Sequence, residues 1–248
     1  ERNFGKIVSR PVDKKENYIK RCIAIPGDKL EIIDGDVYIN GKIQKSLNGK
    51  QYNYIVTTDG SLLNTKILDK IKVANADREM YSGGRYIFPL TDKQVAEFKQ
   101  LKNVKLVERF VASKGNYDSA IFPHSPNYQW NVDNFGPLDI PKKGTTVSIN
   151  KTNWPIYERI IDVYEENDVK ISGEDIYING EKSSQYTFKL DYYWMMGDNR
   201  HKSADSRYWG FVPVDHVVGS AAFIWMSLDK DKKFPSNIRF NRIFKGVK

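Results

Sequence analysis

One lysine occupies a segment whose other residues are typical of a strand. Residues 17–25 read N-Y-I-K-R-C-I-A-I and end at the turn sequence Pro26-Gly27-Asp28. Strand alternation places small or apolar side chains on the same face as Lys20, namely Tyr18, Cys22 and Ala24. Such neighbours remove water from the amine, which disfavours the ammonium form and suits the lysine to general-base chemistry. The alternative is an ordinary lysine that reaches into solvent from an edge strand.

A second candidate region is a polar segment near the end of the chain. Residues 197–213 read G-D-N-R-H-K-S-A-D-S-R-Y-W-G-F-V-P and lie between two apolar stretches, 192–196 and 223–226, that we expect to be core strands. Four charged residues could form pairs that fix the shape of a loop: Asp198, Asp205, Arg200 and Arg207. Ser203 would then present its hydroxyl on a rigid support. The alternative is a solvated loop with incidental charges.

The composition limits the classes of function. Tyr, Ile and Val are abundant among the 248 residues, which favours a β-rich fold. The net charge is +8, but acidic residues are interleaved with the basic ones and no arginine-rich stripe occurs, so we expect no nucleic-acid partner. Cys22 is the single cysteine, which excludes an internal disulfide. With only three histidines we expect no metal site, and no cofactor is needed.

An internal repeat indicates how the chain is organised. The segment Asp36-Val-Tyr-Ile-Asn-Gly41 recurs as Asp175-Ile-Tyr-Ile-Asn-Gly180, at an offset of 175 − 36 = 139 positions. Asn-Gly between β-formers predicts a tight hairpin turn. The same offset pairs Lys20 with Arg159, and because arginine stays protonated only the first copy could supply a base. We expect two copies of one β unit, near residues 5–41 and 144–180.

Between the two copies the pattern changes to alternating strands and helices. The expected strands are 52–58, 85–89 and 104–111, and the expected helices are 61–71 and 91–101. Thr91 and Gln94 form a capping-box sequence at the start of the second helix. A further strand near 71–74 would give a split βαβ order. Residues 113–141 are rich in Pro, Asn, Ser and Gly, which predicts a long ordered loop or linker.

These patterns together predict a mainly β fold with an insertion. Residues 1–50 and 131–248 would form a discontinuous catalytic β domain, and residues 51–130 an inserted α/β subdomain.

Several motifs, in this order, resemble those of bacterial type I signal peptidases. They are Tyr18-Ile-Lys-Arg21, Ile25-Pro-Gly-Asp28, Gly197-Asp-Asn-Arg200, Ser203-Ala-Asp-Ser-Arg207 and Tyr208-Trp-Gly-Phe-Val-Pro213, followed by Ile224-Trp-Met-Ser227. The resemblance covers the beginning and the end of the chain and leaves its middle unmatched. It implies a signal-peptidase-like antiparallel β body. It also implies a serine endopeptidase with a Ser/Lys dyad that removes N-terminal signal peptides from exported preproteins.

The resemblance also implies roles for single residues. Lys20 would be the general base, and Ser203 would orient its amine through a hydrogen bond. Asp205 and Arg207 would form a supporting ion pair, and Arg21 would be structural. The residues implied for the wall of the site are Gly197, Asp198, Asn199 and Arg200.

The sequence departs from the family pattern at several points. The family often carries Asp and Asn where this chain has His201 and Lys202. Its nucleophile lies in a Ser-Met-containing motif that follows a membrane anchor, and no such motif occurs here. Ser9 precedes Lys20 but has the wrong context. Because the chain opens at Glu1 with neither an initiator methionine nor a leader pattern, we expect an inactive fragment whose anchor and nucleophile lie on a missing part.

The resemblance implies partners and a location as well. The partners would be the signal peptides of secreted preproteins, bound by strand addition beside the lysine strand, and the membrane surface, reached through the missing N-terminal anchor. The location would be the bacterial inner (cytoplasmic) membrane, with the catalytic domain on the periplasmic or outer face. Two alternatives stay open. One is a self-cleaving repressor-type Ser/Lys protease, which should lack Gly197-Asp-Asn-Arg200; the other is a non-catalytic binding module for exported polypeptides.

Overall fold

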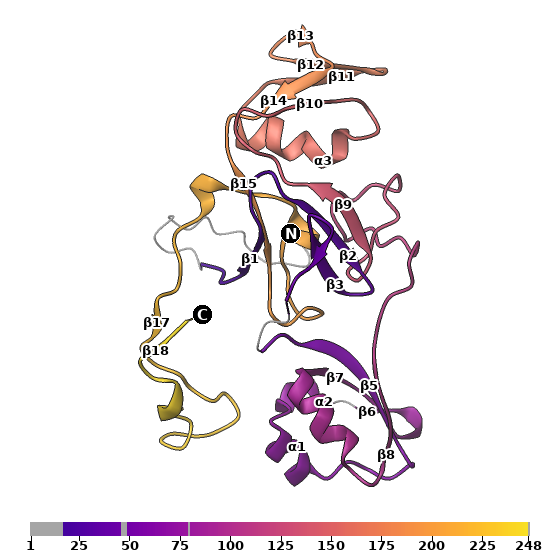
Figure 1. The fold of residues 1–248 in the computed structure, drawn as a ribbon, viewed down its shortest axis with the longest axis vertical. Coiled ribbons are helices and arrows are strands. Elements are labelled where there is room, and N and C mark those ends of the chain that lie inside the picture. The colour runs from indigo at the N-terminus through magenta and orange to yellow at the C-terminus, as the bar shows by residue number, and fades with distance from the viewer. Residues whose placement is uncertain (1–16, 46–48, 79, 248) are drawn as a thin grey trace, which may run out of the picture.

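The computed structural model describes residues 17–45, 49–78 and 80–247 (Figure 1). Strand residues exceed helical residues, and every pair of adjacent strands described here is antiparallel, which confirms the prediction of a mainly β protein. The beginning of the first repeat copy, near residue 5, lies outside the described residues.

Two sheets lie at the centre of the molecule (Figure 1). The first has the order β1-β15-β16, formed by β1 (Arg21–Ala24), β15 (Tyr192–Met196) and β16 (Val212–Pro213). The second has the order β4-β3-β2-β9, formed by β4 (Lys42–Ile43), β3 (Asp36–Ile39), β2 (Lys29–Ile33) and β9 (Phe135–Asp139). Fully buried Leu30, Phe135 and Trp194 belong to one hydrophobic core that joins the sheets. Burial of these large side chains is the main source of the body's stability.

The upper part of the body in Figure 1 contains the second copy of the repeat. Its elements are β10 (Thr146–Ser148), α3 (Trp154–Arg159), the π-helical turn η4 (Ile160–Tyr164), β11 (Val169–Ser172), β12 (Asp175–Ile178), β13 (Glu181–Lys182) and β14 (Gln185–Thr187). The buried side chains of this part, Trp154 and Ile161 among them, belong to the same core as the central sheets.

The two repeat segments form the same hairpin. In each copy the Asn-Gly pair has positive φ at both residues, 53° and 75° at Asn40 and Gly41 and 53° and 85° at Asn179 and Gly180, as a type I′ turn requires. Each asparagine side chain also accepts a backbone N–H 11 residues earlier, at 2.9 Å. The hairpin predicted from Asn-Gly is therefore present twice.

The equivalence of Lys20 and Arg159 is wrong. Arg159 ends helix α3 and its Nε donates to the hydroxyl of Tyr164 at 2.9 Å, whereas Lys20 lies outside any helix, immediately before strand β1. The repeat therefore extends only over the hairpins, and Arg159 says nothing about the chemistry of Lys20.

A buried carboxylate holds the start of β15 in place. Glu165 accepts the hydroxyls of Tyr186 at 2.6 Å and Tyr192 at 2.9 Å, together with the backbone N–H groups of Lys189 and Leu190. Burial and the hydrogen bond to Glu165 raise the pKa of both tyrosines, so they stay protonated and continue to donate. The sequence patterns gave no sign of this network.

The α/β unit, as we call β5–β8 with α1 and α2, has its own core (Figure 1, lower right). Its sheet order is β6-β7-β5-β8, with β5 (Tyr52–Thr58), β6 (Met80–Tyr81), β7 (Arg85–Leu90) and β8 (Val104–Arg109). The helices are α1 (Thr65–Ile71) and α2 (Asp92–Lys99), and the short 3₁₀ turns are η2 (Asn75–Asp77) and η3 (Ser82–Gly84). Phe88 and Phe98 stack with ring centroids 5.4 Å apart in this core.

Several local predictions for this region need correction. Helix α1 begins at Thr65 rather than at residue 61, because the side chain of Asn64 caps it by accepting the N–H of Lys66. No strand occupies 71–74; the extra strand is β6, at Met80–Tyr81. The split βαβ order itself is confirmed, because β7 and β8 are both antiparallel to β5, which lies between them, and helix α2 connects them. The predicted loop 113–141 contains strand β9, which pairs with β2. The capping box at Thr91 and Gln94 is confirmed.

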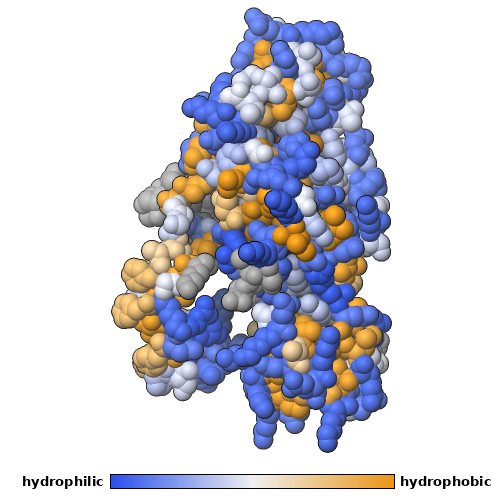
Figure 2. Space-filling model, viewed as in Figure 1, coloured by the Kyte–Doolittle hydropathy of each residue, from blue (hydrophilic) through white to orange (hydrophobic). Residues whose placement is uncertain are grey.

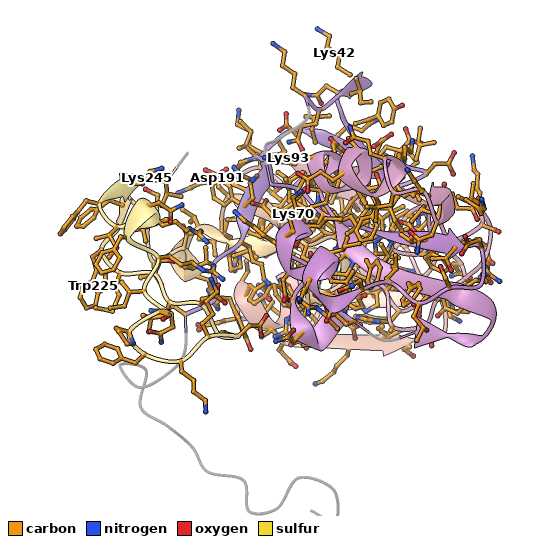
Figure 3. The ribbon with its side chains drawn as sticks, turned by 90° about the horizontal axis from the view of Figure 1, so that it is seen from below. Lys42, Lys70, Lys93, Asp191, Trp225 and Lys245 are labelled. Carbon is orange, nitrogen blue, oxygen red and sulfur yellow. The ribbon has the colours of Figure 1, made fainter. Side chains whose placement is uncertain are left out.

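After β16 the chain passes through η5 (Val214–His216) into the C-terminal segment. Residues 223–226 of this segment were predicted to form a core strand, and that prediction is wrong. Its elements are the short strands β17 (Phe223–Ile224) and β18 (Lys245–Gly246) and the turn η6 (Phe240–Arg242). Trp225 is 68% exposed and Phe223 59% exposed. Figure 2 shows hydrophobic side chains over this segment, and Figure 3 shows Trp225 on its outer side. Among the described residues, no helix has the length and apolar character needed to cross a bilayer.

Candidate active site

The structure brings Lys20 to Ser203 across 183 positions of sequence. Nζ of Lys20 donates to Oγ of Ser203 at 2.9 Å. Lys20 is half-buried immediately before β1, and Ser203 lies in the polar segment after β15, the strand that pairs with β1. The ring of Tyr18 is 5.8 Å from Nζ and stacks on Trp209 at 6.1 Å. An amine held by a hydroxyl at this distance has a fixed direction, which proton transfer requires.

The predicted apolar strand face around Lys20 is wrong. Strand β1 begins one residue later, and a bulge between Cys22 and Ala24 interrupts the alternation, so that Ile23 and Ala24 are both buried. Tyr18 is 77% exposed and Cys22 is exposed. The groups of the site that approach the amine come instead from the polar segment, which we call the site loop, residues 197–207.

Gly197 makes the approach of Lys20 and Ser203 possible. A Cβ atom at this position would lie 2.1 Å from Oγ and 2.6 Å from Cβ of Ser203, and 3.7 Å from Nζ of Lys20. Contacts below 3 Å force a displacement, so any side chain here must move Ser203. The φ of Gly197 is not positive, so the backbone conformation does not require glycine. Glycine is needed here because a side chain would have no space.

We expect Gly197→Ala to uncouple Lys20 from Ser203 while the fold persists. The added methyl occupies the place of the serine hydroxyl, and overpacking of this kind costs about 1–3 kcal/mol. The melting temperature should fall by several degrees and any Lys20-dependent activity should fall by about 10²-fold. Gly246→Ala is the comparison for crowding, because the φ of Gly246 is not positive and a Cβ there would meet nothing closer than 3.9 Å. Full activity of Gly197→Ala would contradict this account.

Asp205 and Arg207 form a fully buried ion pair at the base of the site loop. The carboxylate, 0% exposed, accepts from Nε of Arg207 at 2.9 Å and from Nη2 at 2.8 Å. It also accepts the backbone N–H of Gly197 at 3.0 Å. Burial alone would raise the pKa of Asp205, but the hydrogen bonds and charge of Arg207 and the N–H of Gly197 together hold it below its usual value. The pair therefore fixes the backbone on both sides of Ser203.

A second ion pair joins the residue after Lys20 to the site loop. Arg21 donates from Nε and Nη2 to the two carboxylate oxygens of Asp198, at 2.9 and 3.0 Å. These hydrogen bonds hold the pKa of Asp198 below its usual value. Because both side chains are partly exposed, the pair contributes orientation more than stability. Of the pairings predicted for the four charged residues, Asp205 with Arg207 occurs, whereas Asp198 takes Arg21.

Arg200 and Asn199 hold the site loop in other ways. Arg200 is 2% exposed, and within the described ranges neither its Nε nor its Nη1 has a hydrogen-bond partner. Burial lowers the pKa of Arg200. Its backbone N–H and carbonyl are both bonded, to Gln51 and to Arg207. Asn199 accepts the N–H of Lys202 through Oδ1 at 3.2 Å, which closes the turn that precedes Ser203.

Sequence reasoning missed two side-chain contacts of the site loop. The imidazole of His201 lies between Asp133 and the N–H of Asn53, and the amine of Lys202 pairs with Asp77. The imidazole of His201 is therefore bound to Asn53 and Asp133. The only signal in the sequence was that these positions depart from the family pattern. Ser9 lies outside the described residues.

Comparison with known proteins agrees with the motifs. The family model "Signal peptidase, peptidase S26" matches residues 3–120 and 139–226. Signal peptidase I of Buchnera aphidicola subsp. Acyrthosiphon pisum is 27% identical over 243 residues, which is 96% of this chain and 58% of that protein. Signal peptidase I of Haemophilus influenzae is 43% identical over 70 residues, 28% of this chain and 20% of that protein.

These matches reach further than the motifs did. The middle of the chain, which the motifs left unmatched, falls within both the family model and the Buchnera alignment. The chain spans little more than half the length of the Buchnera protein. With the ordered motifs, the Lys20–Ser203 contact and a family model that matches most of the sequence, the chain belongs to the signal peptidase family, peptidase S26.

Proposed function

We propose that this chain carries the general-base half of an endopeptidase that removes N-terminal signal peptides from exported preproteins. The observation that carries the proposal is the 2.9 Å hydrogen bond between Nζ of Lys20 and Oγ of Ser203, in a chain of the signal peptidase family. A lysine that serves as a general base must have a neutral amine that points at the proton it accepts. The hydrogen bond to the Ser203 hydroxyl orients the amine of Lys20.

The proposed reaction uses a serine hydroxyl that this sequence does not contribute. The neutral amine of Lys20 takes the proton of that hydroxyl as its oxygen attacks the scissile carbonyl, and the resulting ammonium gives the proton to the leaving amine. Lys20 then takes a proton from the water that releases the acyl group. The ion pair of Asp205 and Arg207 keeps Ser203 in position throughout. The chain covers 58% of the Buchnera relative, and in this proposal the nucleophilic serine belongs to the full-length protein.

The substrate and location follow from the same proposal. Strand β1 pairs with β15, and in this proposal an extended peptide binds by strand addition next to Lys20. The partners would be signal peptides with small residues before the cut, and the membrane surface through an anchor outside this sequence. The protein would lie at the bacterial inner membrane with this chain on the periplasmic or outer face.

Ser203→Ala tests the orienting role in the full-length protein. Loss of the hydroxyl leaves the Lys20 amine without its fixed partner, so we expect kcat for cleavage of a preprotein to fall about 10–100-fold with KM little changed. Ser184→Ala, at an exposed serine of the upper hairpin region, should have no effect.

A cleavage assay also distinguishes the proposed endopeptidase from a non-catalytic binding module. If the full-length protein bound an exported preprotein and did not cleave it, the result would favour a non-catalytic binding module. Equal kcat for the parent and Ser203→Ala would show that the 2.9 Å contact has no catalytic role.

A further inference from the structure

The turn that carries Ser203 is bound to the α/β unit by its backbone. The N–H of Gln51 donates to the carbonyl of Asp198 at 2.8 Å, and the N–H of Arg200 donates to the carbonyl of Gln51 at 2.9 Å. Gln51 immediately precedes β5 and pairs with Asn199 in a parallel bridge. The first strand of the α/β unit thus begins as an extension of the site loop.

The His201 side chain adds a buried connection at the same place. Its Nδ1 accepts the N–H of Asn53 in β5 at 3.1 Å, which places its proton on Nε2. Nε2 lies 3.0 Å from Oδ1 of Asp133, whose other oxygen accepts the N–H of Ala112 at 2.9 Å. The imidazole is 6% exposed and its carboxylate partner 2% exposed. Both ring nitrogens are therefore satisfied, and rotation of the ring would leave buried partners unpaired.

Lys202 makes a third connection at the surface. Its Nζ forms an ion pair with Oδ1 of Asp77 in η2, across 125 positions of sequence. The lysine side chain is 49% exposed, so the pair is weaker than the buried His201 contacts. Both residues stand directly before Ser203, and both bind the same unit.

From these contacts we propose that His201 and Lys202 are positioning residues that anchor the Ser203 turn to the α/β unit, which thereby supports the Lys20–Ser203 contact. The proposal rests on the proposed function, since it assigns the anchors a role in that reaction. Gly197 leaves Ser203 no free space to relax, so a shift of the turn is transmitted to Oγ directly. A displacement of about 1 Å at such a group costs up to about 10²-fold in rate.

His201→Phe in the full-length protein is the main test. The phenyl ring keeps the size of the imidazole but neither accepts the Asn53 N–H nor donates to Asp133. We expect kcat to fall about 10–100-fold with KM within about threefold of the parent. His201→Asn should recover part of the loss, because its Oδ1 stands where Nδ1 stood. His216→Phe is the matched control, since His216 also pairs with an aspartate, at 2.8 Å, but is 59% exposed and lies outside the site loop.

Hydrogen exchange separates this proposal from the proposed function. In the parent the N–H groups of Gln51 and Arg200 are hydrogen-bonded, and His201→Phe should accelerate their exchange whether or not the protein cleaves preproteins. Absence of cleavage by the parent would refute the function alone. Unchanged exchange and unchanged kcat in His201→Phe would refute the anchoring role alone.

The surface pair supplies a second test that does not depend on folding of the buried variant. Lys202→Ala, Asp77→Ala and the double variant should each lower kcat by the same factor, about twofold to fivefold, because each removes one ion pair. If Lys202→Ala lowered kcat and Asp77→Ala did not, Lys202 would act without the α/β unit and its anchoring role would be wrong.

Discussion

Lys20→Met in the full-length protein should abolish preprotein cleavage while the fold is retained. Methionine fills a similar volume but cannot accept a proton, and loss of a general base costs about 10²–10⁴-fold in rate. The partner left behind, Ser203, is a neutral hydroxyl that can bond to water, so stability should change by less than about 1 kcal/mol. The measurement is kcat/KM for a preprotein, paired with a thermal melt.

Lys29→Met provides the comparison for removal of a nearby lysine. Lys29 is the first residue of β2, and its amine lies 3.6 Å from Asp139 with more than half of each side chain exposed. We expect no change in cleavage from this variant. Cleavage by Lys20→Met at more than about a tenth of the parent rate would show that another group is the base.

Arg207→Met should be the most destabilising single change among the residues of the site. It leaves the Asp205 carboxylate charged, 0% exposed and without its guanidinium, and removal of one partner from a buried pair costs about 3–5 kcal/mol. The free energy of unfolding, from urea titration, should fall by that amount at neutral pH. Arg239→Met is the comparison, because Arg239 and Asp229 form a partly exposed pair at 3.3 Å worth less than about 1 kcal/mol.

The difference in free energy of unfolding between the parent and Arg207→Met should depend on pH. Because the pKa of Asp205 is held below its usual value in the folded parent, its stabilisation is present above the unfolded pKa and is lost as pH falls through the folded one. In Arg207→Met the buried carboxyl instead prefers to be protonated, so acid relieves the penalty. The stability gap between parent and variant should therefore narrow as pH is lowered from 7 towards about 4. A gap that is constant with pH would mean that the cost is one of packing alone.

The parts of the fold that the sequence predicted are those set by local rules. The Asn-Gly turns at residues 40 and 179 depend on positive φ, and the capping box at Thr91 depends on two neighbouring side chains. Likewise, β15 could be identified as a buried strand from its own apolar run.

The failures arose where distant segments decide the local structure. The alternation expected around Lys20 is broken by a bulge that β15 accommodates, and no pattern within residues 17–25 contains that information. The aromatic run ending at Met226 has the composition of a core strand, yet only the short β18 pairs with its first residues and Trp225 stays exposed. Composition indicates what can be buried, and topology decides what is buried.

Within the site the same division holds. The motifs grouped Lys20, Ser203, Asp205 and Arg207 correctly in space, because their resemblance to a family carries information on tertiary structure. The partner of Arg21 and the connection from His201 to Asp133 join residues 177 and 68 positions apart. No spacing rule covers such pairs, so they could be found only from the structure.

The bridge between Gln51 and the site loop sets a limit on any attempt to make a smaller enzyme. Deleting 52–110 and joining the flanking ends would leave the backbone partners of Gln51 intact but would remove Asn53 and Asp77, and with them two of the three anchors. A shortened version would therefore need a replacement donor for the imidazole of His201 and an acceptor for Lys202. A loop chosen only to span the gap would close the chain and leave the serine turn without support.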